Sequence, residues 1–231
     1  MQYNRLKLLI GNKLDDLKNK NILIVGIGGV GGYALEAIVR SGISNIIIVD
    51  NDVVDITNLN RQIISLHSNI GKCKVDVAKE RVLDINQECN IETHKTYLTK
   101  ENTIELFENK IDYVIDACDT TEVKMELIRI CHSKNIKLIS SMGTGNKMNP
   151  ALLEVTDITK TSYDPLAKKI RKMVKEEKIK GKVMVVSSKE PPLETEEKKL
   201  GSNSFVPATA GLLCASYVIN DIVGDLNEII K

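Results

Sequence analysis

The sequence predicts an α/β fold: a Rossmann-like, mostly parallel sheet flanked by helices, with a C-terminal extension of strands and a long helix. Three observations support this prediction. Apolar runs of strand length alternate with amphipathic segments of helix length, as in βαβ units. The runs are nearly continuous in Ile and Val, as expected of strands buried on both faces. A glycine-rich turn follows the first run, where such folds bind phosphates.

The expected elements follow one another in order along the chain. Strands are expected at residues 22–27, 45–50, 90–97, 112–117 and 137–142. Helical patterns fall between them at about 31–41, 73–87, 102–109 and 121–134.

The C-terminal third has a different character. A strand is expected at 151–158, a helix from the Asp164–Pro165 cap signal to 179, and a strand at 182–188. Residues 189–204 combine two prolines with charge blocks, which predicts an exposed, mobile loop. Residues 206–230 predict one long helix with an apolar face.

Length and composition indicate one domain. The 231 residues suffice for a single sizeable core, with a core at about 1–142 and an extension at about 151–231. Because 32 Lys and Arg nearly balance 31 Asp and Glu, any contact with nucleic acid requires a local patch. Charges interrupt the N-terminal segment, and the apolar stretch near the C-terminus is shorter than a membrane span. We therefore expect a cytoplasmic protein with no membrane segment.

The glycine turn (residues 26–31) lies between the first expected strand and the first expected helix. Gly26 and Gly28 permit a tight turn whose backbone N–H groups can meet phosphate oxygens, and Gly31 lets helix and strand pack closely. Asp50 ends the next strand, where its carboxylate can accept hydrogen bonds from a ribose. Together these features predict a nucleotide site, with a purely structural turn as the alternative.

The residues that follow Asp50 favour ATP over a redox dinucleotide. Asn58 and Arg61 lie on the loop after it, and Lys74 follows that loop. A hydride-transfer enzyme does not need cations here. A triphosphate attacked at its α-phosphorus does, because negative charge builds up on that centre and on the departing pyrophosphate. A solvated surface role is the alternative for Arg61.

Asp119 lies just beyond the carboxyl end of an expected strand, where parallel sheets bind ligands. A lone carboxylate beside phosphates commonly holds Mg²⁺, so Asp119 is the predicted metal ligand. Capping of the next helix is the alternative, because Thr120 and Thr121 open that helix.

The five cysteines do not form a zinc motif. The two nearest, Cys118 and Cys131, are 13 residues apart, so the chain has no CxxC pair. We expect reduced thiols that lie in the core or in helices.

These motifs resemble the ubiquitin-activating-enzyme-like (ThiF/MoeB/HesA) superfamily of adenylating enzymes. The likeness rests on "GIGGVGG", "IIIVDNDVVDITNLNRQI", "IGKCKVDVAKERVLDINQE" and "DYVIDACDTTEVKMEL". Within the superfamily the chain is most similar to the tRNA threonylcarbamoyladenosine dehydratases, on "SSMGTGNKMNPALLEVTDITKTSYDPLAKKIRK", "VVSSKEPP" and "FVPATAGLLCASYVI". The resemblance spans nearly the whole chain and implies a single ThiF-type adenylating domain.

The resemblance implies roles for individual residues. The ATP phosphates and ribose would be held by Gly26, Gly28, Gly29, Gly31, Asp50, Asn58, Arg61, Lys74 and Asp119. Arg61 and Lys74 would also activate the phosphates, and Asp119 would serve Mg²⁺ or ATP. Arg5 matches an N-terminal Arg that reaches into the partner subunit's site in this superfamily, which implies a homodimer and a catalytic role for Arg5.

The resemblance also implies a substrate, the threonylcarbamoyladenosine next to a tRNA anticodon. Its threonyl carboxylate would attack the α-phosphate, giving an acyl adenylate and pyrophosphate. Internal attack on the activated carbonyl would then close a ring and release AMP. A sulfur-carrier or cysteine-desulfurase-type protein is a further implied partner.

Two other functions compete with this one. The first is activation of the C-terminal glycine of a ubiquitin-like sulfur-carrier protein. The branches with that activity often bear zinc CxxC pairs and a crossover-loop cysteine, but here no cysteine lies between Cys131 and Cys214. The same gap argues against a thioester step. The second is a non-catalytic nucleotide-binding protein or an NAD enzyme, against which Arg61, Lys74 and Asp119 count.

The segment 168–182 is the densest basic cluster in the chain, with eight Lys or Arg against two Glu. A solvated amphipathic helix face is one interpretation. The other is a patch that follows the phosphates of tRNA.

Overall fold

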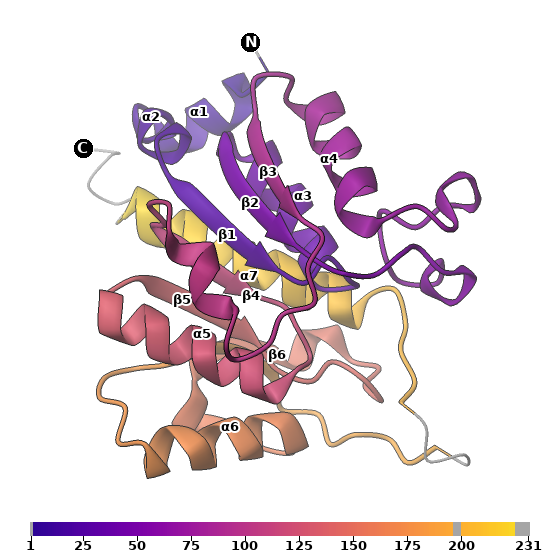
Figure 1. Ribbon diagram of the computed structural model, residues 1–231, viewed down its shortest axis with the longest axis vertical. Coiled ribbons are helices and arrows are strands. Elements are labelled where there is room, and N and C mark those ends of the chain that lie inside the picture. The colour runs from indigo at the N-terminus through magenta and orange to yellow at the C-terminus, as the bar shows by residue number, and fades with distance from the viewer. Residues whose placement is uncertain (1, 196–199, 225–231) are drawn as a thin grey trace.

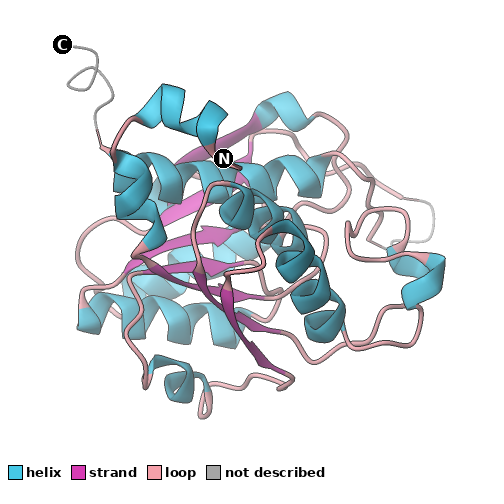
Figure 2. Ribbon diagram, turned by 90° about the horizontal axis from the view of Figure 1, so that it is seen from above, coloured by secondary structure: helices cyan, strands magenta, loops and turns pink. Residues whose placement is uncertain are grey.

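The strands join a seven-stranded sheet that lies between layers of helices (Figure 1, Figure 2). The computed structural model describes residues 2–195 and 200–224. The strands are β1 (Asn21–Val25), β2 (Asn45–Val49), β3 (Asn90–His94), β4 (Tyr113–Asp116), β5 (Lys137–Ser141), β6 (Leu153–Asp157) and β7 (Met184–Ser188). Their order is β3-β2-β1-β4-β5-β7-β6, and among these seven strands of the described chain only β6 and β7 pair antiparallel. The predicted fold class is confirmed.

The central strands are buried on both faces, as their apolar runs predict. Ile24 of β1 pairs with Ile48 of β2 and with Ile115 of β4. Because successive side chains point to opposite faces, Ile24 enters one core cluster, while Leu23 and Val25 enter the other. The sheet is therefore held from both sides, and the carboxyl ends of its strands are placed along one edge.

Helices cover both faces of the sheet. The α-helices are α1 (Asn4–Ile10), α2 (Lys13–Lys18), α3 (Gly31–Arg40), α4 (Lys74–Ile85), α5 (Thr121–Lys134), α6 (Pro165–Glu176) and α7 (Val206–Val223). Short 3₁₀ segments are η1 (Ile56–Asn58), η2 (His67–Asn69), η3 (Thr103–Phe107), η4 (Pro150–Leu152) and η5 (Ile158–Lys160). The helices α2, α3, α4 and α7 contribute to the core of one face, and α5 covers the other with α6 packed against it.

Some predicted elements differ in type or length. The helix expected at 102–109 is the 3₁₀ segment η3, and α1 and α2 were not predicted. The strand expected at 90–97 ends at His94, which leaves Thr96 and Tyr97 in the loop that follows. The strands of the expected core and of the expected extension join the same sheet.

Two predictions concern segments that the structure describes only in part. The helix expected at 206–230 ends at Val223, and residues 225–231 lie outside the described residues. Residues 189–195 and 200–204 form no helix or strand and are mostly exposed, as expected of a loop, whereas 196–199 lie outside the described residues. The mobility of this loop stays a prediction.

By length and composition alone, α7 could cross a membrane. A core helix of a soluble protein passes the same test. Here Ala210, Cys214 and Val218 of α7 are fully buried, and the helix contacts α3 and the strands from β4 to β7. Its apolar character is therefore accounted for by packing against the sheet.

Candidate active site

A cavity of about 590 Å³ opens at the carboxyl ends of the parallel strands. Eight of the ten predicted site residues line it, and they come from the turns and loops that follow β1, β2 and β4. These residues are Gly26, Gly28, Gly29, Asp50, Asn58, Arg61, Lys74 and Asp119. The edge of a parallel sheet brings together segments that are far apart in the sequence.

The glycine turn packs against the loop after β4 so closely that side chains are excluded. Gly26 has φ +87°, and a Cβ on it would lie 2.8 Å from the carbonyl oxygen of Ala117. A Cβ on Gly31 would lie 1.7 Å from the carbonyl oxygen of Gly26. Gly31 is not among the residues that line the cavity, so its place supports a packing role and not the expected contact with phosphates.

Asp50 braces the glycine turn. Its Oδ2 accepts the backbone N–H of Ile27 at 2.6 Å, and its Oδ1 accepts the N–H of Asp52 at 2.8 Å. A carboxylate oxygen has a second lone pair, so Asp50 can still accept hydrogen bonds from a ribose in the cavity. The expected ribose contact is thus compatible with a structural role that the sequence did not indicate.

Lys74 is a nearly buried cation that begins α4. Only 4% of the residue is exposed, and its Nζ lies 2.7 Å from Oδ2 of Asp52. A buried ammonium needs such a partner. Asp52 also lines the cavity, and the sequence analysis missed it. Its position two residues after Asp50, just beyond the same strand, was a usable signal.

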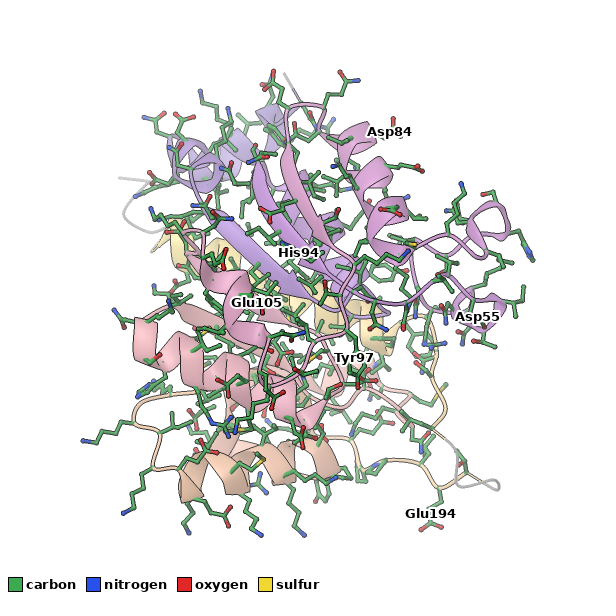
Figure 3. The ribbon with its side chains drawn as sticks, viewed as in Figure 1. Asp55, Asp84, His94, Tyr97, Glu105 and Glu194 are labelled. Carbon is green, nitrogen blue, oxygen red and sulfur yellow. The ribbon has the colours of Figure 1, made fainter. Side chains whose placement is uncertain are left out.

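Arg61 belongs to the projecting loop (residues 50–73) between β2 and α4, on which Asp55 is labelled in Figure 3. Its Nη1 donates to the carbonyl oxygen of Thr57 and to Oδ1 of Asn60, both at 2.8 Å. Asp55 and Asn58 form a capping box, in which Oδ1 of Asn58 accepts the N–H of Asp55 at 3.1 Å. These bonds leave the amide N–H groups of Asn58 and the rest of the guanidinium to face a ligand.

Asp119 is exposed in the cavity wall, and its Oδ1 accepts a hydrogen bond from Thr120 Oγ1 at 3.5 Å. This bond is not a cap on the backbone of α5, so the capping alternative gains no support. In the described ranges no group of three or more His, Cys, Asp or Glu could hold a metal alone. Asp119 therefore fits a Mg²⁺ ion that takes its other oxygen ligands from phosphates and water.

The cavity extends past these residues at both ends. Beyond β3 it is lined by Thr96, Tyr97 and Leu98, and Figure 3 labels Tyr97 on this loop. Beyond β5, at what we call the acceptor end, it is lined by Thr144, Gly145, Leu200 and Ser202.

The two loops of the acceptor end are hydrogen-bonded to each other. Asn146 donates its N–H to the carbonyl oxygen of Gly201 at 2.9 Å and accepts the N–H of Gly201 on Oδ1 at 2.5 Å. Asn60 of the projecting loop donates to the carbonyl oxygen of Ser202 at 3.1 Å. The described part of the loop expected at 189–204 thus forms a wall of the cavity.

Comparison with known proteins agrees with the geometry. The ThiF family matches residues 2–229. The chain belongs to the ThiF family. It is 42% identical to the tRNA threonylcarbamoyladenosine dehydratase of Bacillus subtilis, over 97% of this chain and 96% of that protein.

Two solved structures are similar over nearly their full length. The tRNA N6-threonylcarbamoyladenosine dehydratase of Escherichia coli, TcdA, in complex with ATP has a TM-score of 0.86 and 33% identity, covering 96% of each chain. The same enzyme in complex with AMP has a TM-score of 0.87 and 32% identity, covering 100% of this chain and 99% of that one.

Cys118 packs against a core cluster, as expected of the cysteines, and it also lines the cavity, which was not expected. Its Sγ lies 3.1 Å from Oδ1 of Asp116. Burial and the neighbouring Asp116 raise the pKa of the Cys118 thiol well above its usual value. A thiol that stays protonated is a poor nucleophile, so its place in the wall does not make it a catalytic group.

Arg5 does not line the cavity of its own ThiF-family chain. It is exposed on α1, which lies near the start of β1 in Figure 1, whereas the cavity lies at the other end of the strands. The hydroxyl of Tyr3, which precedes α1, donates to the carbonyl oxygen of Val39 near the end of α3. A role for Arg5 in catalysis therefore requires a second copy of the chain.

Proposed function

We propose that this chain uses ATP to dehydrate N6-threonylcarbamoyladenosine in tRNA, through an acyl adenylate, to the cyclic form. The observation that carries the proposal is a cavity that combines the glycine turn with Arg61, Lys74 and Asp119. This set suits activation of a carboxylate on an α-phosphate, and relatives with this activity in their names match the chain over almost its full length.

In this proposal ATP lies along the cavity, with its base beyond β3 and its phosphates at the glycine turn. Tyr97 would contact the base, Asp50 the ribose, and the backbone N–H groups of the glycine turn the phosphates. Arg61 and Lys74 would stabilise the negative charge that develops on the α-phosphate and on pyrophosphate. Asp119 would hold Mg²⁺, which when bound neutralises phosphate charge and orients the triphosphate.

The reaction consumes one ATP for each water removed. The threonyl carboxylate bonds to the α-phosphorus, and the bond to pyrophosphate breaks. Internal attack on the acyl carbon then closes the ring and releases AMP, which carries away the carboxylate oxygen. In this proposal the modified base occupies the acceptor end beyond β5, beside the α-phosphate.

The basic segment 168–182 is the surface proposed to receive tRNA. The helix α6 begins at its cap Asp164, whose Oδ2 accepts the N–H of Gly143 at 2.6 Å, two residues before Gly145 of the acceptor end. Most of its basic residues are exposed: Lys168, Lys169, Lys172, Lys175, Lys178, Lys180 and Lys182. Phosphates that flank the modified nucleotide could thus bind near the cavity.

A homodimer is part of the proposal. Arg5 would complete the partner's cavity, and the neighbouring Leu8 and Leu9, which are 87% and 69% exposed, would be covered by the second copy. A cytoplasmic location, where tRNA is available, is also proposed. A sulfur-carrier or cysteine-desulfurase-type partner stays a prediction.

Activation of a sulfur-carrier glycine is the weaker candidate. The chain lacks the zinc-binding CxxC pairs that often accompany this activity. The free cysteines Cys73, Cys89, Cys118, Cys131 and Cys214 are dispersed over the fold.

Mass spectrometry of tRNA nucleosides tests the proposal. Incubation of the protein with ATP, Mg²⁺ and tRNA that carries threonylcarbamoyladenosine is expected to remove one water from that nucleoside and to form AMP. Omission of ATP and the Arg61→Ala variant are the controls. If folded protein that binds ATP leaves the nucleoside unchanged, or adenylates a carrier protein instead, the assignment is wrong.

A further inference from the structure

Behind the cavity wall lies a buried ion pair that the proposed function does not use. Lys124 of α5 and Asp116 at the end of β4 are both 0% exposed, and Nζ lies 3.0 Å from Oδ2. The same ammonium donates to the carbonyl oxygen of Ser141 at 2.8 Å and to Oγ of Ser140 at 3.3 Å. Ser140 Oγ in turn donates to Oδ2 of Asp116 at 2.5 Å. These four residues connect β4, β5 and α5.

Stability alone does not account for this pair. Desolvation of two charges offsets much of their attraction, and apolar residues of similar volume often replace a buried pair at no cost. Burial acts to lower the pKa of Lys124, but the charge and hydrogen bond of Asp116, together with Cys118 and Cys214, outweigh it, and the net pKa is raised. The ammonium therefore stays charged, and its three N–H groups satisfy oxygens on two strands at once, which no apolar side chain can do.

The pair also reaches the two loops that line the far half of the cavity. The second oxygen of Asp116, Oδ1, accepts the backbone N–H of Cys118 at 3.2 Å, and Cys118 directly precedes Asp119. Through Ser141, Lys124 holds the end of β5, three residues before Thr144 of the acceptor end. The ammonium of Lys124 thus links the loop that carries Asp119 to the loop of the acceptor end, and so fixes the distance between them.

We propose that Lys124 and Asp116 are positioning residues that hold the loops after β4 and β5 at the distance required for attack on the α-phosphate. This inference rests on the proposed function for its effect on turnover. The strands β1, β2 and β3, which carry most of the nucleotide half of the cavity, make no hydrogen bond to the side chains of the pair, so the pair should affect turnover more than ATP binding.

A double replacement separates positioning from stability. The Lys124→Met variant leaves Asp116 buried without its partner and is expected to unfold at a lower temperature. The Asp116→Leu/Lys124→Met variant removes both charges and is expected to unfold at a higher temperature than Lys124→Met, although the carbonyl oxygen of Ser141 and the N–H of Cys118 lose their partners. Its turnover should stay reduced roughly 10- to 100-fold, the size of effect that small misplacements of reacting groups produce. The affinity for ATP should fall far less than turnover.

The control is a second ion pair that links β5 to a helix, between Lys137 and Asp221 at the amino end of β5, which is more exposed and where Nζ and Oδ2 are 2.5 Å apart. Its double replacement, Lys137→Met/Asp221→Leu, should leave turnover at the parental level. Parental turnover in a folded Asp116→Leu/Lys124→Met variant would overturn the inference, because the pair would then serve stability only.

Hydrogen exchange provides a readout that does not depend on the proposed function. In the Asp116→Leu/Lys124→Met variant the backbone amides of residues 117–119 and 142–145 should exchange faster, while those of α4, which does not contact the network, should not change. Unchanged exchange in the first two segments would overturn the inference even if the parent chain proved inactive on tRNA. Faster exchange with an inactive parent would instead reject the proposed function and keep the positioning role.

Discussion

Arg61 and Lys74 are both tied to the protein beside the cavity, Arg61 through Thr57 and Asn60, and Lys74 through Asp52. A cation held in this way can stabilise charge as it develops without first having to reorganise. The two residues come from different elements, the projecting loop and α4, so each provides charge from its own direction.

We predict that Arg61→Ala and Lys74→Ala each lower turnover roughly 100-fold or more, because both cations favour the transition state over bound ATP. Calorimetric ATP affinity should fall far less. Lys72→Ala is the matched control, since Lys72 is exposed and does not line the cavity. Parental turnover of either variant would remove that residue from the catalytic set.

We predict that no cysteine is essential, and Cys118 is the decisive position because it lines the cavity. The Cys118→Ser variant keeps a donor to Asp116 and should dehydrate tRNA like the parent. Because burial and Asp116 raise the pKa of this thiol, the alkaline limb of the pH–rate profile should also be unchanged. Cys214→Ala, in the core, provides the comparison. A folded Cys118→Ser variant without activity would revive a thioester route.

Sequence patterns could predict most of the nucleotide residues, since the glycine turn, Asp50 and the block from Asn58 to Arg61 are local motifs in fixed contexts. They could not predict Asp52 as the partner of Lys74, nor the link from Lys124 to Asp116. These pairs depend on how α4 and α5 pack on the sheet. The role of Cys118 also depends on burial, which its spacing does not reveal.

Some helices and strands can also be predicted from their local sequence, whereas others depend on packing against distant segments. Strands with continuous Ile and Val runs, such as β1 and β2, are where the sequence places them. The helix expected at 102–109 is 3₁₀, because a short segment has little helical propensity of its own and takes the form that packing allows. The direction of β6, antiparallel to β7, has no local sequence signal.

The basic face of α6 needs a more careful choice of variants than its sequence suggests. Arg171 donates to the carbonyl oxygen and to Oγ1 of Thr161, so its replacement would disturb the start of the helix as well as the charge. Exposed lysines of the same helix do not have this drawback.

We predict that charge reversal of exposed α6 lysines to Glu weakens tRNA binding and leaves ATP binding intact. The variants are Lys168→Glu, Lys169→Glu, Lys172→Glu and Lys175→Glu, combined. Phosphate contacts release counterions, so the affinity should also fall steeply with salt, and less steeply for the variant. Filter binding across a salt series measures both effects. Reversal of Lys18 and Lys79, on α2 and α4, is the control, and an equal loss there would refute a specific α6 surface.

Within one chain, Arg5 and the cavity lie at opposite ends of the sheet. Arg5 is exposed near the amino ends of the strands, and the cavity opens at their carboxyl ends (Figure 1). Arg5 therefore does not reach the cavity of its own chain.

We predict that mixing Arg5→Ala chains with Lys74→Ala chains restores activity. In a heterodimer one cavity carries both changes and the other carries none, so up to half the parental activity per dimer should return. Each variant alone should be nearly inactive. Verified heterodimers that remain inactive would show that Arg5 does not complete a partner's site.

The order β3-β2-β1-β4-β5 has a consequence for how new activities can arise on this scaffold. In the proposed binding mode, the loops that would contact the base, ribose and phosphates follow β3, β2 and β1, and the loops that would contact the acceptor come from later in the chain. The residues that would bind ATP and the residues that would bind the acceptor therefore lie mostly in different segments of the sequence. Exchange of residues 142–147 and 200–204 for those of a relative should therefore change which acceptor is bound and leave the residues proposed for adenylation unchanged.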